Sequence, residues 1–205
     1  MMTIPQLYEK LKSEEFLDPS RGIIAYNYYI YPYPANREYE FREQIEDFKE
    51  NLIRPNTFAD VLCINLYEEL CDFLKSKEMM GQSMLEILFE KEADDPEDSD
   101  FITDYLMQVT QDPEFYKFLS DKINTHLVPE TGKIKPYIFV YGIGSIYPYL
   151  RVNRFLATFE DYNQSGKYRV IVFYPGDVEG NYFKLFGVLT DRHNYRAVKL
   201  INDLQ

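Results

Sequence analysis

The stretch KPYIFVYGIGS, Lys135 to Ser145, decides the fold class of this chain. It begins with β-branched and aromatic residues that predict a strand up to Tyr141, and its two glycines predict a tight turn. Apolar residues at helical spacing then predict a helix over Ile146–Phe159, with Pro148 in its first turn. The next apolar run, Arg169–Tyr174 (RVIVFY), is typical of a strand covered on both faces. Strand, helix and strand at this spacing predict parallel neighbours in one sheet.

The rest of the chain continues this alternation of helices and strands. The expected helices start at the capping residues Thr3 and Ser83, contain Phe41–Leu52 and Glu68–Lys77, and cover about 101–110 and 113–127. The other expected strands are Gly22–Tyr31, Phe58–Leu66, Tyr182–Leu189 and Tyr195–Ile201, the last two joined by Thr190–Asn194 as a C-terminal hairpin, while Pro175-Gly176 ends Arg169–Tyr174.

These elements predict an α/β fold in a single domain over residues 1–205. We expect a mostly parallel central sheet with helices on both faces, in a Rossmann-like or P-loop-like three-layer arrangement. A helical, acidic insertion is expected at about 79–130, and the run Glu90–Asp100, with seven acids and one Lys, is expected to form an exposed loop.

Charge and composition exclude several classes of protein. The chain has 34 acids and 22 bases, a net charge of −12, so neither a general grip on nucleic acid nor binding to an anionic membrane is expected. Residues 1–132 carry a net charge of −16 (28 acids, 12 bases) and residues 133–205 a net charge of +4 (6 acids, 10 bases). No apolar run approaches the roughly 20 residues of a membrane span. We expect a cytoplasmic protein whose two cysteines, Cys63 and Cys71, are free thiols.

Aromatic residues are abundant, with 19 Tyr and 15 Phe in 205 residues. A tyrosine ring can be buried while its hydroxyl finds a polar partner, which suits either a protein-binding surface or a Tyr-rich core. Rings at strand ends and arginines near the glycine turn are the candidates for partner contacts: Tyr28, Tyr29, Tyr31, Tyr33, Tyr147, Tyr149, Arg151 and Arg154.

The turn Gly142-Ile143-Gly144-Ser145 lies between a predicted strand and a predicted helix, where phosphate-binding proteins place glycines. The third glycine of the dinucleotide motif is replaced by Tyr147, and the chain contains no Walker A sequence. Gly142, Gly144 and Ser145 therefore form a possible anion site, and the alternative is a tight turn that needs glycine for its backbone and serine as a cap.

No residue set predicts catalysis. His126 and His193 have no second ligand at metal-binding spacing, so no metal and no cofactor are expected. Glu68 and Glu69 follow a predicted strand, but without a nucleophile motif they are interpreted as an acidic helix start.

Four segments together resemble the BrxB family: NYYIYPYP (Asn27–Pro34), VYGIGSIYPYLRVNR (Val140–Arg154), VIVFYPG (Val170–Gly176) and LFGVLTDRHNYRAVKL (Leu185–Leu200). BrxB proteins are small cytosolic components of bacterial BREX anti-phage systems, which methylate host adenines and block phage replication. The resemblance implies a non-catalytic or uncharacterised role in a multi-protein assembly. It implies a PglZ-type protein, which has a phosphatase-like domain, and other BREX components as partners, and it carries over no catalytic residues.

Three functional hypotheses follow. The leading one is an α/β adaptor that binds a partner protein through Tyr-rich strand ends and the glycine turn. The second is a degenerate nucleotide-binding protein that uses the turn Gly142–Ser145. The third, DNA binding by the basic C-terminal third, conflicts with the overall negative charge.

Overall fold

The computed structural model describes residues 3–13, 16, 27–53, 60–96, 100–126, 136–163, 167–179, 182–192 and 198–199. Within them, a sheet has a parallel centre in the order β2-β5-β6-β1-β9. Its strands are β1 (Tyr28–Tyr33), β2 (Val61–Asn65), β5 (Tyr137–Tyr141), β6 (Arg169–Glu179) and β9 (Val198–Lys199). β7 (Tyr182–Leu185) and β8 (Leu189–Arg192) extend the far end of β6 in antiparallel pairing, so the sheet is mixed and only partly parallel.

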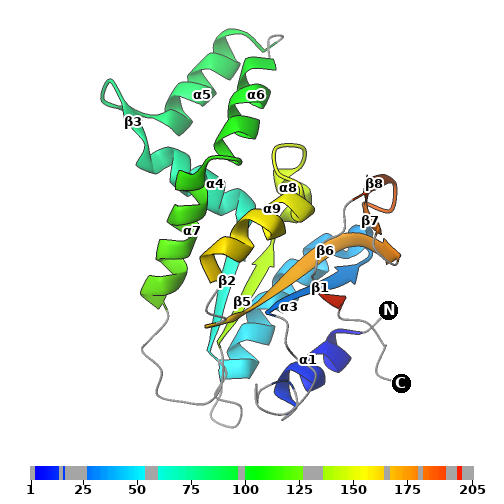
Figure 1. Cartoon of the computed structure of the whole chain (residues 1–205). Helices are drawn as coiled ribbons and strands as arrows, with labels where there is room; N and C mark the ends of the chain where they lie inside the picture. The colour runs from blue at the N-terminus through cyan, green and yellow to red at the C-terminus, as the bar shows by residue number, and fades with distance from the viewer. Residues whose placement is uncertain are drawn as a thin grey trace.

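Helices cover both faces of the sheet (Figure 1). On one face lie α1 (Ile4–Lys12) and α3 (Glu38–Ile53), whose apolar residues pack on Tyr29, Tyr31 and Tyr33. The opposite face packs on α4 (Leu66–Ser76), α7 (Pro113–His126), α8 (Ile143–Ile146) and α9 (Val152–Phe159), followed by η2 (Glu160–Asn163). All six residues of β1 are buried, and since side chains alternate along a strand, both of its sides face the core. The prediction of an α/β fold with helices on both faces is confirmed.

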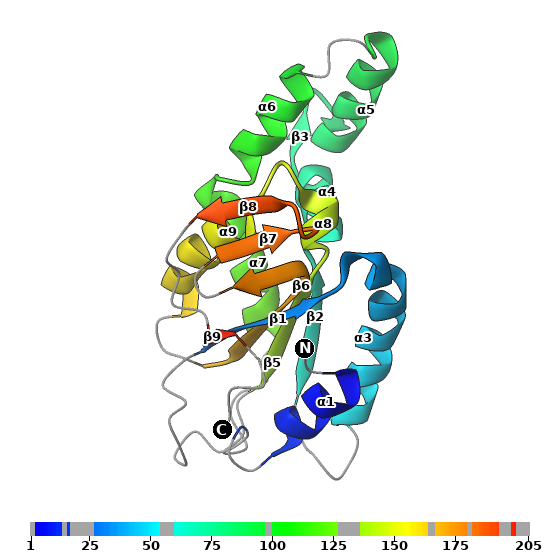
Figure 2. The same ribbon diagram turned by 90° about the vertical axis from the view of Figure 1, so that its right-hand side faces the viewer.

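A helical lobe projects beyond the sheet (Figures 1 and 2). We define this lobe as residues 78–109, which comprise the hairpin strands β3 (Glu78–Met79) and β4 (Gln82–Ser83) and the helices α5 (Met84–Asp94) and α6 (Asp100–Val109). The capping box at Ser83 starts α5 as predicted. The expectation that Glu90–Asp100 forms a loop is wrong for its first half, because α5 continues to Asp94.

Two predicted strand ends are wrong, because a proline lies inside each strand and not after it. Pro32 lies inside β1, and Pro175 lies inside β6, which continues to Glu179. The carbonyl of Asn27 accepts from Val170 of β6 and so points toward that strand. Because the backbone groups of successive residues point to opposite sides of a strand, those of Pro32 face away from β6. On that side the described β9 pairs only with residues 29 and 30. Proline is tolerated where no ladder bond needs its missing N–H group.

The C-terminal hairpin turns earlier than predicted. Its turn is Phe186–Val188, with positive φ at Phe186 and at Gly187 (56° and 76°), and the predicted turn at Thr190–Asn194 is wrong because Thr190 belongs to β8. Glycine adopts this left-handed backbone without steric cost, which places the bend at residue 187. The described part of the last predicted strand, β9, pairs in parallel with β1 instead of joining the hairpin.

The helix predicted over Ile146–Phe159 is in fact two helices. α8 ends at Ile146, a turn follows that includes Pro148, and α9 begins at Val152. Proline interrupts a helix away from its first turn, and here it lies between the two helices. Parts of the predicted strands, 22–26 and 58–59, lie outside the described residues, as does His193. No helix in the described ranges has both the length and the apolar character needed to cross a bilayer.

Candidate functional site

The chain leaves the carboxyl ends of β1 and β5 toward opposite faces of the sheet. After β1 it enters η1 (Ala35–Arg37) and α3, and after β5 it enters α8. In parallel sheets such a switch point leaves a crevice in which ligands bind. A pocket of about 260 Å³ opens there. Its lining residues are Ala35, Glu38, Tyr39, Arg42, Gly144, Ser145 and Phe186.

A chain of polar contacts crosses this crevice and joins α3 to α8. The hydroxyl of Tyr33 donates a hydrogen bond to the carboxylate of Glu38. Arg42 Nε donates to Glu38 Oε1 over 3.0 Å, and its Nη2 donates to Ser145 Oγ over 2.5 Å. Burial, followed by the hydrogen bond to Glu38, raises the pKa of Tyr33 above its usual range, so the hydroxyl remains a donor. The network therefore holds two helices together that flank the pocket.

This arrangement lacks the parts of a nucleophilic site. Ser145 Oγ accepts from a guanidinium, which cannot act as a base. His126, the histidine that the structure describes, lies at the amino end of β2, with Nε2 3.1 Å from Asp60 Oδ1, whereas the pocket lies at the carboxyl ends of the strands. Within the described ranges, no group of three or more His, Cys, Asp or Glu side chains is placed to hold a metal.

The glycines of the turn are required by close packing. Gly142 has φ +78°, and a Cβ atom built on it would lie 2.2 Å from Asn65 Oδ1. A Cβ on Gly144 would lie 2.9 Å from the ring of Phe186. The backbone N–H groups of Ser145 and Ile146 both donate to the carbonyl of Gly142, each over 3.1 Å. Two of the amides that could cradle an anion are therefore engaged within the turn, and the anion site at Gly142, Gly144 and Ser145 stays a prediction.

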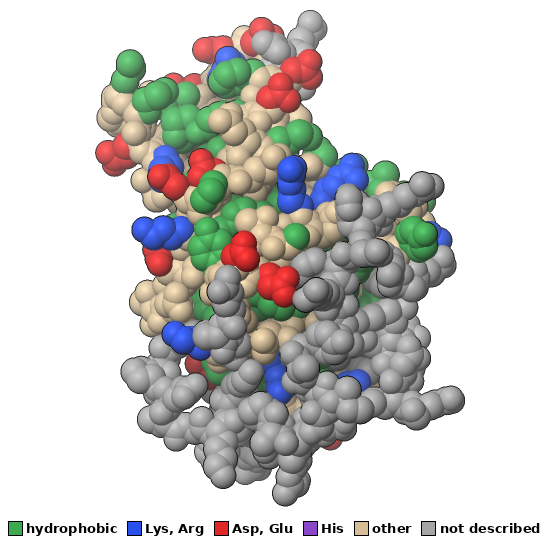
Figure 3. Space-filling view, in the orientation of Figure 1, with side chains coloured by type: hydrophobic (Ala, Val, Ile, Leu, Met, Phe, Trp, Pro, Cys, Tyr) green, Lys and Arg blue, Asp and Glu red, His purple; other side chains and the backbone are tan. Residues whose placement is uncertain are grey.

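A surface of rings and arginines adjoins the pocket. We call Tyr147, Tyr149, Arg151 and Arg154 the ring–arginine surface; both tyrosines are partly exposed and both arginines are exposed. The ring of Tyr147 meets that of Phe186 edge to face, with centroids 6.4 Å apart, and the Arg151 guanidinium lies 6.0 Å from the Tyr147 centroid. Figure 3 shows Lys and Arg side chains over the α8–α9 region.

Four of the predicted contact residues lie in the core. Tyr28, Tyr29, Tyr31 and Tyr33 are all buried within the sheet, because helices cover both of its faces. Their placement corrects the expectation that these rings lie at a contact surface.

The acidic start of α4 takes part in a helix cap and an ion pair that the sequence did not reveal. Asn65 caps this helix by accepting from the Tyr67 N–H over 3.2 Å, and its Nδ2 donates to Glu68 Oε1 over 2.8 Å. Glu69 is buried and accepts from Lys122 Nζ over 2.5 Å. The link from Arg42 to Ser145 was also missed, although the spacing of Glu38 and Arg42 one helical turn apart, just after a strand, is a signal that could have found half of it.

Comparison with known proteins places the chain in a family. The family described as "BREX protein BrxB" matches residues 62–200, from β2 through β9. The chain belongs to the BrxB family. BrxB proteins of similar sequence include "BREX protein BrxB" of Bacillus cereus (strain H3081.97), 25% identical over 179 residues that cover 85% of this chain and 83% of the relative. Another is "BREX protein BrxB" of Escherichia coli O9:H4 (strain HS), 19% identical over 200 residues that cover 98% and 90%. No solved structure matches significantly.

The expected membership of a BREX anti-phage system is thereby confirmed. The matched part of this BrxB chain contains the glycine turn, the ring–arginine surface and the lobe, whereas Glu38 and Arg42 precede it.

Proposed function

We propose that the chain is a non-catalytic adaptor of a BREX phage-defence assembly that binds a PglZ-type partner protein through the ring–arginine surface. The observation that carries the proposal is the position of Arg151 and Arg154. Arg151 is the N-cap residue of α9 and makes no side-chain cap, and the first turn of α9 holds no acid. A helix N-terminus disfavours cations by about 0.3–1 kcal/mol, so helix stability does not account for two exposed arginines there.

The neighbouring rings give this surface the composition of a protein interface. Tyr and Arg are the residues that most often dominate binding energy at such interfaces. Tyr147 is supported from behind by Phe186 and lies beside Arg151, so it has a fixed position from which to contact a partner. Fixed rings lose little conformational entropy on binding. An acidic or phosphorylated face on the partner would complement the arginines.

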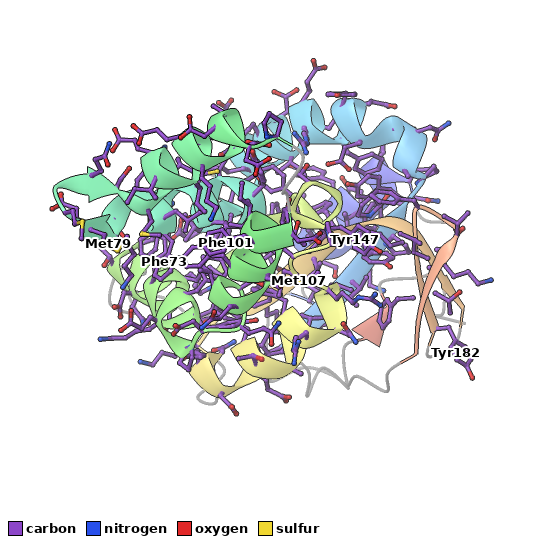
Figure 4. All side chains as sticks on the ribbon, turned by 90° about the horizontal axis from the view of Figure 1, so that it is seen from above. Phe73, Met79, Phe101, Met107, Tyr147 and Tyr182 are labelled. Carbon is purple, nitrogen blue, oxygen red and sulfur yellow. The ribbon has the colours of Figure 1, made fainter. Side chains whose placement is uncertain are left out.

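The test is a pull-down with the PglZ-type partner. Tyr147→Ala and Arg151→Ala should each lower the affinity about tenfold or more, with unchanged circular dichroism. Tyr182→Ala and Lys117→Ala are matched controls, because both residues are exposed and Figure 4 shows Tyr182 well apart from Tyr147. The proposal fails if the wild-type chain captures no partner, or if the controls and the test variants bind alike.

The pocket, which is lined by Gly144 and Ser145, supports a second candidate function, degenerate nucleotide binding at the turn Gly142–Ser145. Its position at the switch point favours ligand binding. Glu38 in the same lining pairs with Arg42 over 3.0 Å, and the volume of about 260 Å³ is smaller than most ligand pockets, which start at roughly 300 Å³. Calorimetry against ATP, GTP and NAD tests this candidate, and absence of heat at millimolar ligand removes it. Hydrolysis of a nucleoside triphosphate that is lost in Ser145→Ala would instead contradict the non-catalytic proposal.

A further inference from the structure

The lobe exposes large apolar side chains at its tip and along both helices. Met80, at the turn of the β3–β4 hairpin, is 99% exposed, Phe89 on α5 is 59% exposed and Phe101 on α6 is 48% exposed. Figure 3 shows hydrophobic side chains gathered over this part of the molecule. Exposed apolar patches of this kind mark binding sites in soluble proteins.

Other side chains attach the lobe to the core, and Phe101 stacks on one of them, Tyr105, with ring centroids 6.4 Å apart. The residues of α5 and α6 that pack on the core include Leu85, Ile102 and Leu106. Phe89 and Phe101 are not among the described side chains of that core cluster. Phe89 and Phe101 are nevertheless about half exposed, and together with Met79 and Met80 we call them the lobe face. Methionine side chains are flexible and adapt to the shape of a bound partner.

The charge around the lobe face is strongly negative. The described residues of the lobe, 78–96 and 100–109, contain eight Asp and Glu and a single Lys, a net charge of −7. That lysine, Lys91, places its Nζ atom 3.4 Å from the centroid of the Phe101 ring. The ring face thus already attracts a cation of the lobe itself, as the negative face of an aromatic ring does. A partner with both cationic and apolar side chains would match the acids and the exposed rings of the lobe.

We propose that the lobe face binds a basic amphipathic helix of a partner protein, with its apolar side on Phe89 and Phe101 and its Lys and Arg residues toward the surrounding acids. In this mode the apolar anchors of the partner helix, one helical turn apart, would contact the exposed rings of the lobe. The charge disfavours the other occupants: a second copy of the lobe, nucleic acid and an anionic membrane would all be repelled. The contact is additional to the one proposed at the ring–arginine surface and uses different residues.

The first experiment measures binding of a defined probe to the full-length chain. The probe is a fluorescent peptide of about 18 residues with Leu on one helical face and Lys on the other, compared with a scrambled peptide of equal charge by anisotropy. The ordered peptide should bind about tenfold more tightly than the scrambled one, and Phe101→Ser and Phe89→Ser should each remove that difference. Tyr182→Ser, another exposed ring at 52%, should not. Equal binding of both peptides, or unchanged binding by the lobe variants, overturns the proposal.

The second experiment identifies the occupant in cells that carry the complete BREX operon. Phe101→p-benzoylphenylalanine introduces a photo-cross-linker at the lobe face, and Tyr182→p-benzoylphenylalanine is the matched control, distant from Phe101 and Met79 in Figure 4. Cross-linked peptides are sequenced by mass spectrometry. A basic amphipathic peptide of another protein, obtained at position 101 and not at 182, supports the proposal. A peptide of this chain, an acidic or uncharged peptide, or no cross-link overturns it, whether or not the PglZ-type pull-down succeeds.

Discussion

Replacing Gly142 by alanine tests how the glycine turn is held in place. An alanine at φ +78° costs about 1–2 kcal/mol because its Cβ crowds the following carbonyl. The same Cβ would lie 2.2 Å from Asn65 Oδ1, so the asparagine side chain must move away from the start of α4. Loss of an asparagine cap costs about 1 kcal/mol. We expect Gly142→Ala to lower the free energy of unfolding by about 2–3 kcal/mol, as measured by urea denaturation.

The chain offers a matched control for the backbone part of this cost. Gly81 has φ +87°, and a Cβ atom there would meet nothing within 4 Å. Gly81→Ala should therefore cost only about 1–2 kcal/mol. In the double variant Gly142→Ala/Asn65→Ala the clash is absent, so its loss of stability should be smaller than the two single losses added together. Equal costs at positions 81 and 142, or an additive double variant, would refute the reasoning.

Three further predictions concern one hydrogen bond and two raised pKa values. Tyr33→Phe removes the donor to Glu38 and should lower the free energy of unfolding by about 1 kcal/mol in urea denaturation; an unchanged midpoint would contradict this. Burial raises the pKa of Glu69 above its ordinary value of 4.5 in spite of Lys122, so its proton is held more tightly in the folded state. As the pH rises from below 4.5 through the raised pKa, wild-type stability should fall relative to Glu69→Gln, and the opposite slope would show that the ion pair dominates. Burial raises the pKa of Cys63 to about 12, so iodoacetamide at pH 8 should modify this half-buried thiol much more slowly in the native chain than in urea, as mass spectrometry can check; equal rates would refute it.

Local patterns were enough to predict where helices start, whereas the length of a strand depends on partners that lie far away in the sequence. The capping boxes at Thr3 and Ser83 are both present, because each is complete within four residues. The extent of β6 beyond Pro175 depends on β7, which supplies a new partner from Gly176 onward. The residues around Pro175 therefore did not indicate that the strand continues past it.

The candidate site was predictable only in part. The turn at Gly142–Ser145 and the rings after it were found from glycine spacing and composition. The bond between Arg42 and Ser145 joins residues 103 positions apart, and no local pattern reports such a contact. The tyrosines of β1 look alike in sequence whether they face a partner or a core, and only the helices on both faces decide between the two.

The pairing of β1 has a consequence for how the chain matures on the ribosome. Both of its described neighbours, β6 and β9, are synthesised more than 130 residues later. This tyrosine-rich strand therefore stays without its partner strands until almost the entire polypeptide has emerged. Such late strand pairing is slow and leaves the segment prone to aggregation. A stalled or shortened product that ends before Arg169 would lack both strands that shelter this segment.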